Sequence, residues 1–349
     1  MGFEHRTGTT SRRRFLQYLA MLGVGGRILL RSGDAWAAVD AAREAAGSDI
    51  ALPAMTYRKL GRTGFDASRL VFGCGASLMF RSKDDLLQAG FDAGINVFDV
   101  GYRGYYRNAE EHLAPFLRKN RDRVFLISKA PAPIEREPDE TVTIAEAKQA
   151  ASTWAERLDA SLKELQVDRV NAYYLMASYN PSLIESEEIY RTFQDAKRAG
   201  KVAHLGLSTH RNAEKVLLTA ARTGWYDLAM IAITPGGWYD WESKAILAGS
   251  KPMTDLQPVL EGVRASGMGL VGMKAARYIA GRWFLPWGNP DAFEEHYAEN
   301  LRAAPFTPFQ RSYAYVLAHG LDVVNADIQS LPQLHENVIA TVSSPQFFA

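Results

Sequence analysis

The feature that most constrains this chain of 349 residues is a regular alternation of short apolar runs with amphipathic segments. The apolar runs have the composition of buried β-strands and cover residues 70–73, 95–99, 124–128, 170–176, 203–207, 228–233, 270–273 and 323–326. Each is followed or preceded by a segment with helical periodicity, at 83–93, 109–118, 144–165, 183–199, 212–223, 253–266, 308–318 and 331–341. Eight strand and helix units in alternation predict an α/β fold of the (β/α)8 TIM barrel type.

Ionisable side chains stand where two consecutive runs end. Asp99 closes the second run, a glycine- and tyrosine-rich loop leads from it to Tyr106, and Lys129 follows the third run. Functional groups of α/β folds gather at the carboxyl ends of the strands. A lysine and a carboxylate beside a phenol can lower its pKa toward the range in which it works as an acid. We therefore expect a proton-transfer site at this rim.

The motifs around these residues resemble those of the aldo-keto reductase family. The family pattern G-I-N-x-F-D is matched at 94–99, Y-x-x-S/A-E at 106–110, and S/T-K at 128–129. The resemblance extends from about Tyr57 to the C-terminus. It implies a barrel whose bottom is plugged by an N-terminal hairpin, here residues 55–68, and it implies nicotinamide-dependent reduction of a carbonyl group.

Asp99, Tyr106 and Lys129 are the catalytic residues that this resemblance implies. Tyr106 is the expected proton donor because its spacing to Glu110 matches the family. Its interval from Asp99 is seven residues where the family usually has five, so Tyr102 and Tyr105 remain alternative donors.

The fourth catalytic position departs from the family. Met176 stands where the family has a histidine that orients the substrate carbonyl. A thioether neither donates a hydrogen bond nor carries charge, so it cannot polarise a carbonyl oxygen. His210, just beyond the fifth run, is either a substitute donor or an ordinary histidine at the rim.

The resemblance also implies a set of residues that bind a nicotinamide cofactor: Ser208, Thr209, Met230, Lys274, Arg277, Glu336 and Asn337. Thr209 and Met230 replace the usual asparagine and glutamine. Lys274 is the first candidate for a phosphate contact, and Arg277 is the second.

Residues 324–329 replace the family's I-P-G-x-x-R, and Asp327 adds a negative charge where a phosphate would lie. The expected cofactor is NADP or NAD, with NADP slightly favoured.

The N-terminus differs from the rest of the chain. Arg12, Arg13 and Arg14 precede an apolar stretch, and Ala35 and Ala37 have the spacing that a signal peptidase requires. We expect a twin-arginine signal peptide over 1–37, a linker over 38–54 and the barrel over 55–349. A basic amphipathic helix is the alternative. A twin-arginine signal implies a periplasmic protein that is exported folded by the twin-arginine machinery.

Composition excludes several classes of function. The net charge is +1 and no basic tract interrupts the body of the chain, so we expect no nucleic-acid partner. Cys74 is the single cysteine, which excludes an internal disulfide and any cysteine-held metal site. We expect no metal and a small carbonyl or sugar-like substrate.

Two aromatic segments have two interpretations each. One contains Trp283, Trp287, Phe293, His296, Tyr297 and Phe306, and the other covers 238–241. Each covers either a substrate or the side of the barrel.

The leading hypothesis is an exported oxidoreductase of the aldo-keto reductase type. The alternatives are a catalytically degenerate barrel that acts as a periplasmic binding or scaffold protein, and a barrel that oxidises a sugar alcohol with a permanently held cofactor.

Overall fold

The computed structural model describes residues 52–280 and 289–343. The predicted signal peptide, most of the predicted linker, Trp283 and Trp287 lie outside the described residues. The strands of the barrel are β3 (Leu70–Gly73), β4 (Val97–Asp99), β5 (Phe125–Ala130), β6 (Val170–Leu175), β7 (Val202–Thr209), β8 (Leu228–Thr234), β11 (Gly269–Met273) and β12 (Val323–Asp327). Each pairs in parallel with the next, and β12 pairs with β3, so the sheet closes on itself. The predicted TIM barrel is confirmed.

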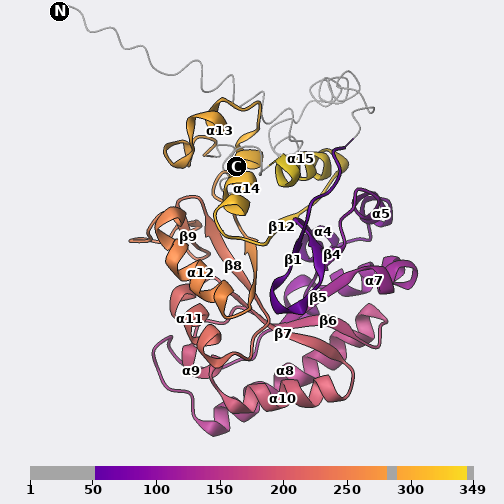
Figure 1. Cartoon of the computed structure of the whole chain (residues 1–349). Helices are drawn as coiled ribbons and strands as arrows, with labels where there is room; N and C mark the ends of the chain where they lie inside the picture. Colours follow the sequence, from indigo (N-terminus) through magenta and orange to yellow (C-terminus); the bar gives the residue numbers. More distant parts are fainter. Residues whose placement is uncertain (1–51, 281–288, 344–349) are drawn as a thin grey trace, which may run out of the picture.

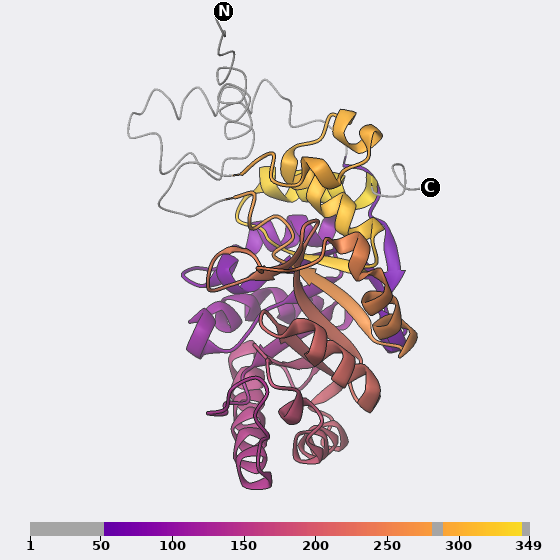
Figure 2. The same cartoon turned by 90° about the vertical axis from the view of Figure 1, so that its left-hand side faces the viewer.

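Helices surround the barrel. They are α4 (Cys74–Leu78), α5 (Asp84–Asp92), α6 (Arg103–Tyr106), α7 (Ala109–Asn120), α8 (Ile144–Leu165), α9 (Pro181–Ile184), α10 (Glu187–Arg198), α11 (Ala213–Thr223), α12 (Gln257–Ala265), α13 (Glu299–Ala303), α14 (Pro308–Ala318) and α15 (Leu331–Ser343). Figure 1 shows them as a ring that runs from α5 and α7 through α8 and α10 to α11 and α12, and α14 and α15 complete it. Seen from the side in Figure 2, α15 and α8 lie at opposite ends of the molecule.

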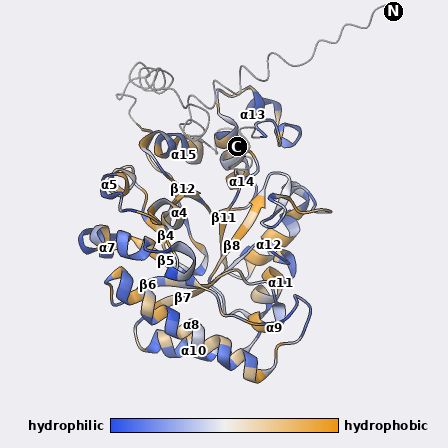
Figure 3. Ribbon diagram, turned by 180° about the vertical axis from the view of Figure 1, so that it is seen from behind, coloured by the Kyte–Doolittle hydropathy of each residue, from blue (hydrophilic) through white to orange (hydrophobic). Residues whose placement is uncertain are grey.

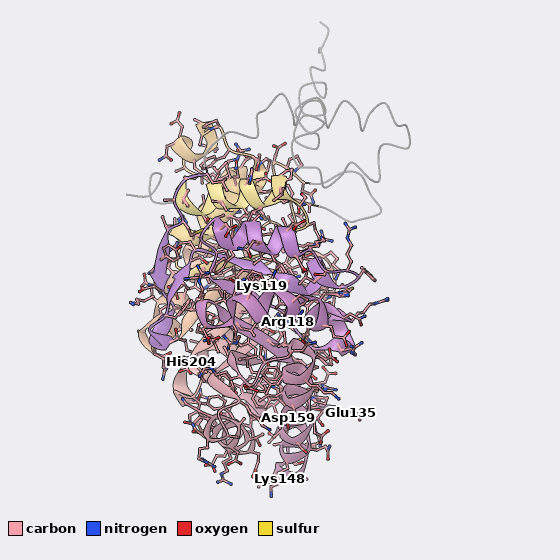
Figure 4. All side chains as sticks on the ribbon, turned by 90° about the vertical axis from the view of Figure 1, so that its right-hand side faces the viewer. Arg118, Lys119, Glu135, Lys148, Asp159 and His204 are labelled. Atoms are coloured by element: carbon pink, nitrogen blue, oxygen red, sulfur yellow. The ribbon has the colours of Figure 1, made fainter. Side chains whose placement is uncertain are left out.

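The core has two parts because strand side chains alternate between the two faces of the sheet. Val97, Ile127, Ala172, Met230 and Val271 belong to the cluster that fills the barrel interior. A larger cluster lies between the outer face of the strands and the helices. The helices are apolar on one side only: α8 and α10 carry blue and orange faces in Figure 3. Figure 4 shows charged side chains on the outer surface, with Arg118 and Lys119 on α7 and Lys148 and Asp159 on α8.

The antiparallel hairpin β1 (Tyr57–Lys59) and β2 (Asp66–Ser68) lies before the first barrel strand, as expected. Leu60 and Ala67 belong to the cluster that fills the barrel interior, and both are fully buried. The hairpin therefore closes one end of the barrel core. The amide of Arg62 donates a hydrogen bond to the carbonyl of Gly267 (2.7 Å), which ties the turn to the segment before β11.

Local structure differs from expectation at several places. An extra antiparallel hairpin, β9 (Gly237–Asp240) and β10 (Ala245–Ile246), extends from β8, and no periodicity predicted it because its strands are so short. The single helix expected over 183–199 is two helices, since α9 ends at Ile184 and the extended backbone of Ser186 (ψ 121°) precedes α10. The helix expected over 253–266 begins as a 3-10 turn, and α12 follows it with a proline in its first turn. No helix within the described ranges is long and apolar enough to cross a membrane.

Candidate active site

A buried ion pair joins β4 to β5 at the rim of the barrel. The Nζ of Lys129 donates hydrogen bonds to Oδ1 (2.7 Å) and Oδ2 (2.6 Å) of Asp99. It also donates to the carbonyl oxygen of Val100 (2.7 Å). Asp99 and Lys129 are each only 4% exposed. Burial of an ammonium without a partner is costly, and three oxygens here satisfy its three donors. The structure thus brings together two of the residues that the sequence indicates.

Tyr106 packs directly over this pair. It ends α6, and its ring lies so close to two glycines that a Cβ on Gly75 or Gly101 would approach it to 2.5 Å or 2.8 Å. The Nζ of Lys129 is 5.4 Å from the centre of the Tyr106 ring. The absence of a side chain at these two glycines therefore leaves room for the phenol beside the lysine.

The two alternative tyrosines have other surroundings. The guanidinium of Arg157 lies 5.0 Å from the centre of the Tyr102 ring. Tyr105 is 47% exposed, and its ring meets the Tyr106 ring edge-on at 4.8 Å between centroids. Tyr106 is the last residue of the short helix α6, so this helix places the last tyrosine of the loop next to the ion pair.

The electrostatics of Tyr106 differ from expectation. The pKa of its hydroxyl is raised above the usual range, first by the loss of surrounding water and then by the charge of Asp99. The expected lowering by lysine fails because the burial of the phenol and the charge of Asp99, which is bonded to Lys129, outweigh it. The phenol is therefore protonated at neutral pH.

Met176 follows β6 directly, and its amide donates to the carbonyl of Ala130 at the end of the lysine strand (2.9 Å). The fourth catalytic position of the resemblance thus lies at the same rim. His210 follows β7, and its ring centre is 5.8 Å from that of Trp241. Burial and the nearby charges of lysines lower the pKa of His210 to about 3, so its imidazole is neutral at neutral pH.

Two of the residues expected to contact the nicotinamide, Ser208 and Thr209, lie on opposite faces of β7. Ser208 is buried, and its Oγ accepts a hydrogen bond from the amide of Ala177 (3.2 Å). Thr209 is the next residue along the strand and therefore faces the opposite side, where its hydroxyl donates to the carbonyl of Arg211 (2.9 Å). Met230 belongs to the barrel interior and is paired in register with Ser208. Ser208 and Met230 face the site, and Thr209 does not.

Lys274 lies beyond the end of β11 and has a positive φ of 66°. Residues other than glycine rarely adopt this backbone conformation. Its Nζ is 4.4 Å from the centre of the Trp241 ring, and the Nζ of Lys244 is 3.1 Å from the same centre. Burial lowers the pKa of Lys274 to about 8, with further lowering by Arg277 and other cations and an opposing effect of Asp327. A partly desolvated lysine among other cations fits a phosphate group.

The residues at the end of β12 and on α15 are held mainly by contacts within the protein. Asp327 accepts hydrogen bonds from Nε2 of Gln329 at both carboxylate oxygens (2.8 and 2.9 Å). Glu336 accepts a hydrogen bond from the hydroxyl of Thr307, and its pKa is raised to about 7 chiefly by burial. Asn337 is 6% exposed. Glu336 is thus part of the contact between α15 and the start of α14.

The two aromatic segments occupy different places in the fold. Phe293 and Tyr297 are buried in the cluster between strands and helices, so they cover the side of the barrel. Trp241 packs against the barrel interior and is the aromatic residue that meets His210 and Lys274. In the part of the chain that the structure describes, no group of three or more His, Cys, Asp or Glu residues could hold a metal ion.

One further residue at the site was not predicted from sequence. Asn325 lies on β12 and donates a hydrogen bond from Nδ2 to Oδ2 of Asp99 (2.7 Å). The sequence signal was the polar residue in an otherwise apolar run, two positions before Asp327.

Comparison with known proteins agrees with the resemblance. Residues 71–234 match the model of the Aldo/keto reductase family. Among solved structures, the aldo-keto reductase of Klebsiella pneumoniae in complex with NADPH is 19% identical, with a TM-score of 0.59 over 83% of this chain and 90% of that chain. An aldo-keto reductase of Bacillus halodurans in its holo form is 18% identical, with a TM-score of 0.59 over 84% and 95%. No curated protein sequence matches the chain. The resemblance to the aldo-keto reductase family is thereby confirmed.

Proposed function

We propose that this barrel, with the aldo-keto reductase motifs on its rim, is an oxidoreductase that uses NADPH or NADH to reduce the carbonyl group of an aldehyde or ketone, or oxidises the corresponding alcohol. The observation that carries the proposal is the buried pair of Lys129 and Asp99 beneath the ring of Tyr106. A buried ion pair with a phenol at a barrel rim has the chemistry of a proton-transfer site.

Each of the three residues has a separate role. The hydroxyl of Tyr106 gives its proton to the carbonyl oxygen, and its raised pKa keeps it protonated until a substrate accepts that proton. Lys129 provides positive charge beside the phenolate that forms. Asp99 keeps the lysine in place through two hydrogen bonds. The hydride for the carbonyl carbon would come from a reduced nicotinamide bound at this rim.

Residues at the rim fit such a cofactor in part. The hydroxyl of Ser208 and the cations Lys274 and Arg277 are the groups that would hold its amide and its phosphates. Glu336 and Asn337 would meet the adenine end. The complex of the Klebsiella protein with NADPH and the cations near Lys274 favour NADP over NAD.

Because the thioether of Met176 cannot orient the substrate carbonyl, another group has to do so. His210 is the candidate because it lies within electrostatic reach of both Lys129 and Lys274, and a neutral imidazole retains one N–H donor. The apolar side chain at 176 makes the site selective for carbonyl compounds that are already electrophilic, such as aldehydes.

The cell compartment is part of the proposal. The twin arginines of residues 12–14 indicate export by the twin-arginine route to the periplasm, with the cofactor bound before export. Small carbonyl compounds or sugars are the proposed substrates, and no nucleic acid is involved.

The assay is loss of NADPH absorbance with a panel of aldehydes and ketones. Tyr106→Phe keeps the ring and removes only the hydroxyl, so kcat falls by about a hundredfold or more, the usual contribution of a general acid. Tyr105→Phe is the matched control because it changes the neighbouring, exposed phenol. Equal activity of Tyr106→Phe and wild type contradicts the assignment of Tyr106.

A second candidate function is a degenerate barrel that binds a ligand without redox chemistry. The methionines at positions 176 and 230 favour it, since both stand where the family has polar side chains. A folded protein that binds neither NADPH nor NADH supports this alternative.

A further inference from the structure

Asn325 contacts the ion pair from the side opposite to Lys129. It lies on β12, which pairs with β3, and β3 in turn pairs with the aspartate strand β4. Its Nδ2 is 2.7 Å from Oδ2 of Asp99 and 3.6 Å from Sδ of Met230. The two hydrogens of this amide thus have separate acceptors on two other strands.

The backbone makes space for this side chain. A Cβ on Gly73 would lie 2.6 Å from Oδ1 of Asn325 and 2.7 Å from the carbonyl oxygen of Ala326. Any side chain at position 73 would therefore displace the amide. Gly73 lies beside Asp99 in the register of the sheet, so the missing Cβ is next to the carboxylate that the amide contacts.

Hydrogen bonds from two directions fix the carboxylate of Asp99. Lys129 donates to both of its oxygens, and Asn325 adds a third donor from β12, which β3 alone separates from β4. Bonds to a charged acceptor are stronger than bonds between neutral groups. Without the amide, the carboxylate has freedom to rotate about its side-chain bonds and to draw the lysine with it.

Two departures from the family motifs meet at this point. Met230 and Asn325 each replace a different residue type on their strands, and the amide donates to the thioether. Since the two side chains touch, they act as one unit that supports Asp99 from within the barrel.

We propose that Asn325 is a positioning residue for the reaction: it holds the carboxylate of Asp99 so that Lys129 stays beneath Tyr106. This inference rests on the proposed oxidoreductase function. It assigns to Asn325 no contact with substrate or cofactor.

Asn325→Leu tests the inference because leucine has the same number and branching of side-chain heavy atoms and no donor. Asn171→Leu is the matched control, since Asn171 is also a strand amide, and its Oδ1 accepts from the amide of Leu126 (2.9 Å) away from the ion pair. Asn325→Ala serves if the leucine variant does not fold. Each variant is made in the full chain and compared with wild type.

The first readout separates kcat from nucleotide affinity. We expect Asn325→Leu to lower kcat by about tenfold, the effect of one lost hydrogen bond to a charged group, with the Kd for NADPH within about twofold of wild type. Asn171→Leu leaves kcat unchanged. An unchanged kcat in Asn325→Leu, or an equal fall in both variants, overturns the inference.

The second readout needs no cofactor. A double-mutant cycle of Asn325→Leu with Asp99→Asn measures the equilibrium constant for unfolding in urea. We expect the two changes to couple by about tenfold, because each removes the same charge-assisted bond. Additive effects overturn the inference. A wild-type protein that binds no nucleotide contradicts the proposed function instead, and the cycle still decides whether Asn325 holds Asp99.

Discussion

Replacement of Glu110 by glutamine tests the electrostatics of the interior most sharply. Glu110 lies on α7, is 1% exposed, and accepts a hydrogen bond from the hydroxyl of Ser128 (2.6 Å). Burial raises its pKa from 4.5 to about 7, partly offset by hydrogen bonds from Ser128 and Ser161. The fold therefore favours the protonated carboxyl group.

The raised pKa of Glu110 determines how the stability of the fold changes with pH. A group whose pKa is higher in the folded state binds its proton more tightly there, so stability is greatest at low pH and falls as pH rises from 4.5 through about 7. The full loss is the shift of about 2.5 units multiplied by about 1.4 kcal/mol per unit, or about 3.5 kcal/mol. Glutamine is neutral throughout and keeps an oxygen for Ser128, so it carries no such loss.

We expect Glu110→Gln to be more stable than wild type by about 3 kcal/mol near pH 8, and by less than about 1 kcal/mol near pH 5. Urea unfolding at a series of pH values measures the difference. Glu111→Gln is the matched control because this neighbouring carboxylate is exposed and pairs with Arg103 at the surface, where ion pairs contribute little. A gap between Glu110→Gln and wild type that does not change with pH would refute the reasoning.

Three further predictions concern packing and charge. Asp322→Ala removes a 3% exposed carboxylate that pairs with two arginines and accepts from the amide of Leu270, so it lowers the free energy of unfolding by about 3–5 kcal/mol, measured by urea titration. Gly75→Ala brings a Cβ to 2.5 Å from the ring of Tyr106 and displaces it, so kcat falls about tenfold or more with little change in the Kd for NADPH. Thr143→Ala removes the N-cap of α8 and lowers the melting temperature through a loss of about 1 kcal/mol, whereas Thr143→Ser has almost no effect.

Much of the fold is predictable from sequence because it depends on repetition. Each strand run and each helix has a period of its own, and eight repeats leave few alternatives to a barrel. The β9 and β10 hairpin was not predictable, since β10 has only two residues and no alternation can be read from them. The division of the helix expected over 183–199 depends on the extended backbone of Ser186 (ψ 121°), which the longer amphipathic pattern does not reveal.

The sequence predicts those residues of the candidate site that lie at the end of a strand. Asp99 and Lys129 each end a run, and their pairing follows from the neighbouring positions of β4 and β5. The place of Tyr106 depends on a helix of four residues that the loop sequence does not reveal. Asn325 could not be predicted as a partner of Asp99, because the contact joins positions 226 residues apart and needs the closed barrel.

Titration with nicotinamide nucleotides tests directly whether this barrel is an oxidoreductase. Purified protein is titrated separately with NADPH and NADH, and the nicotinamide fluorescence is followed, with circular dichroism as the check that the protein is folded. We expect saturable binding of at least one of the two well below millimolar concentration, and weaker binding when Lys274 is replaced by methionine. Folded protein that binds neither nucleotide up to about millimolar concentration, corresponding to a binding free energy weaker than about −4 kcal/mol, contradicts the account.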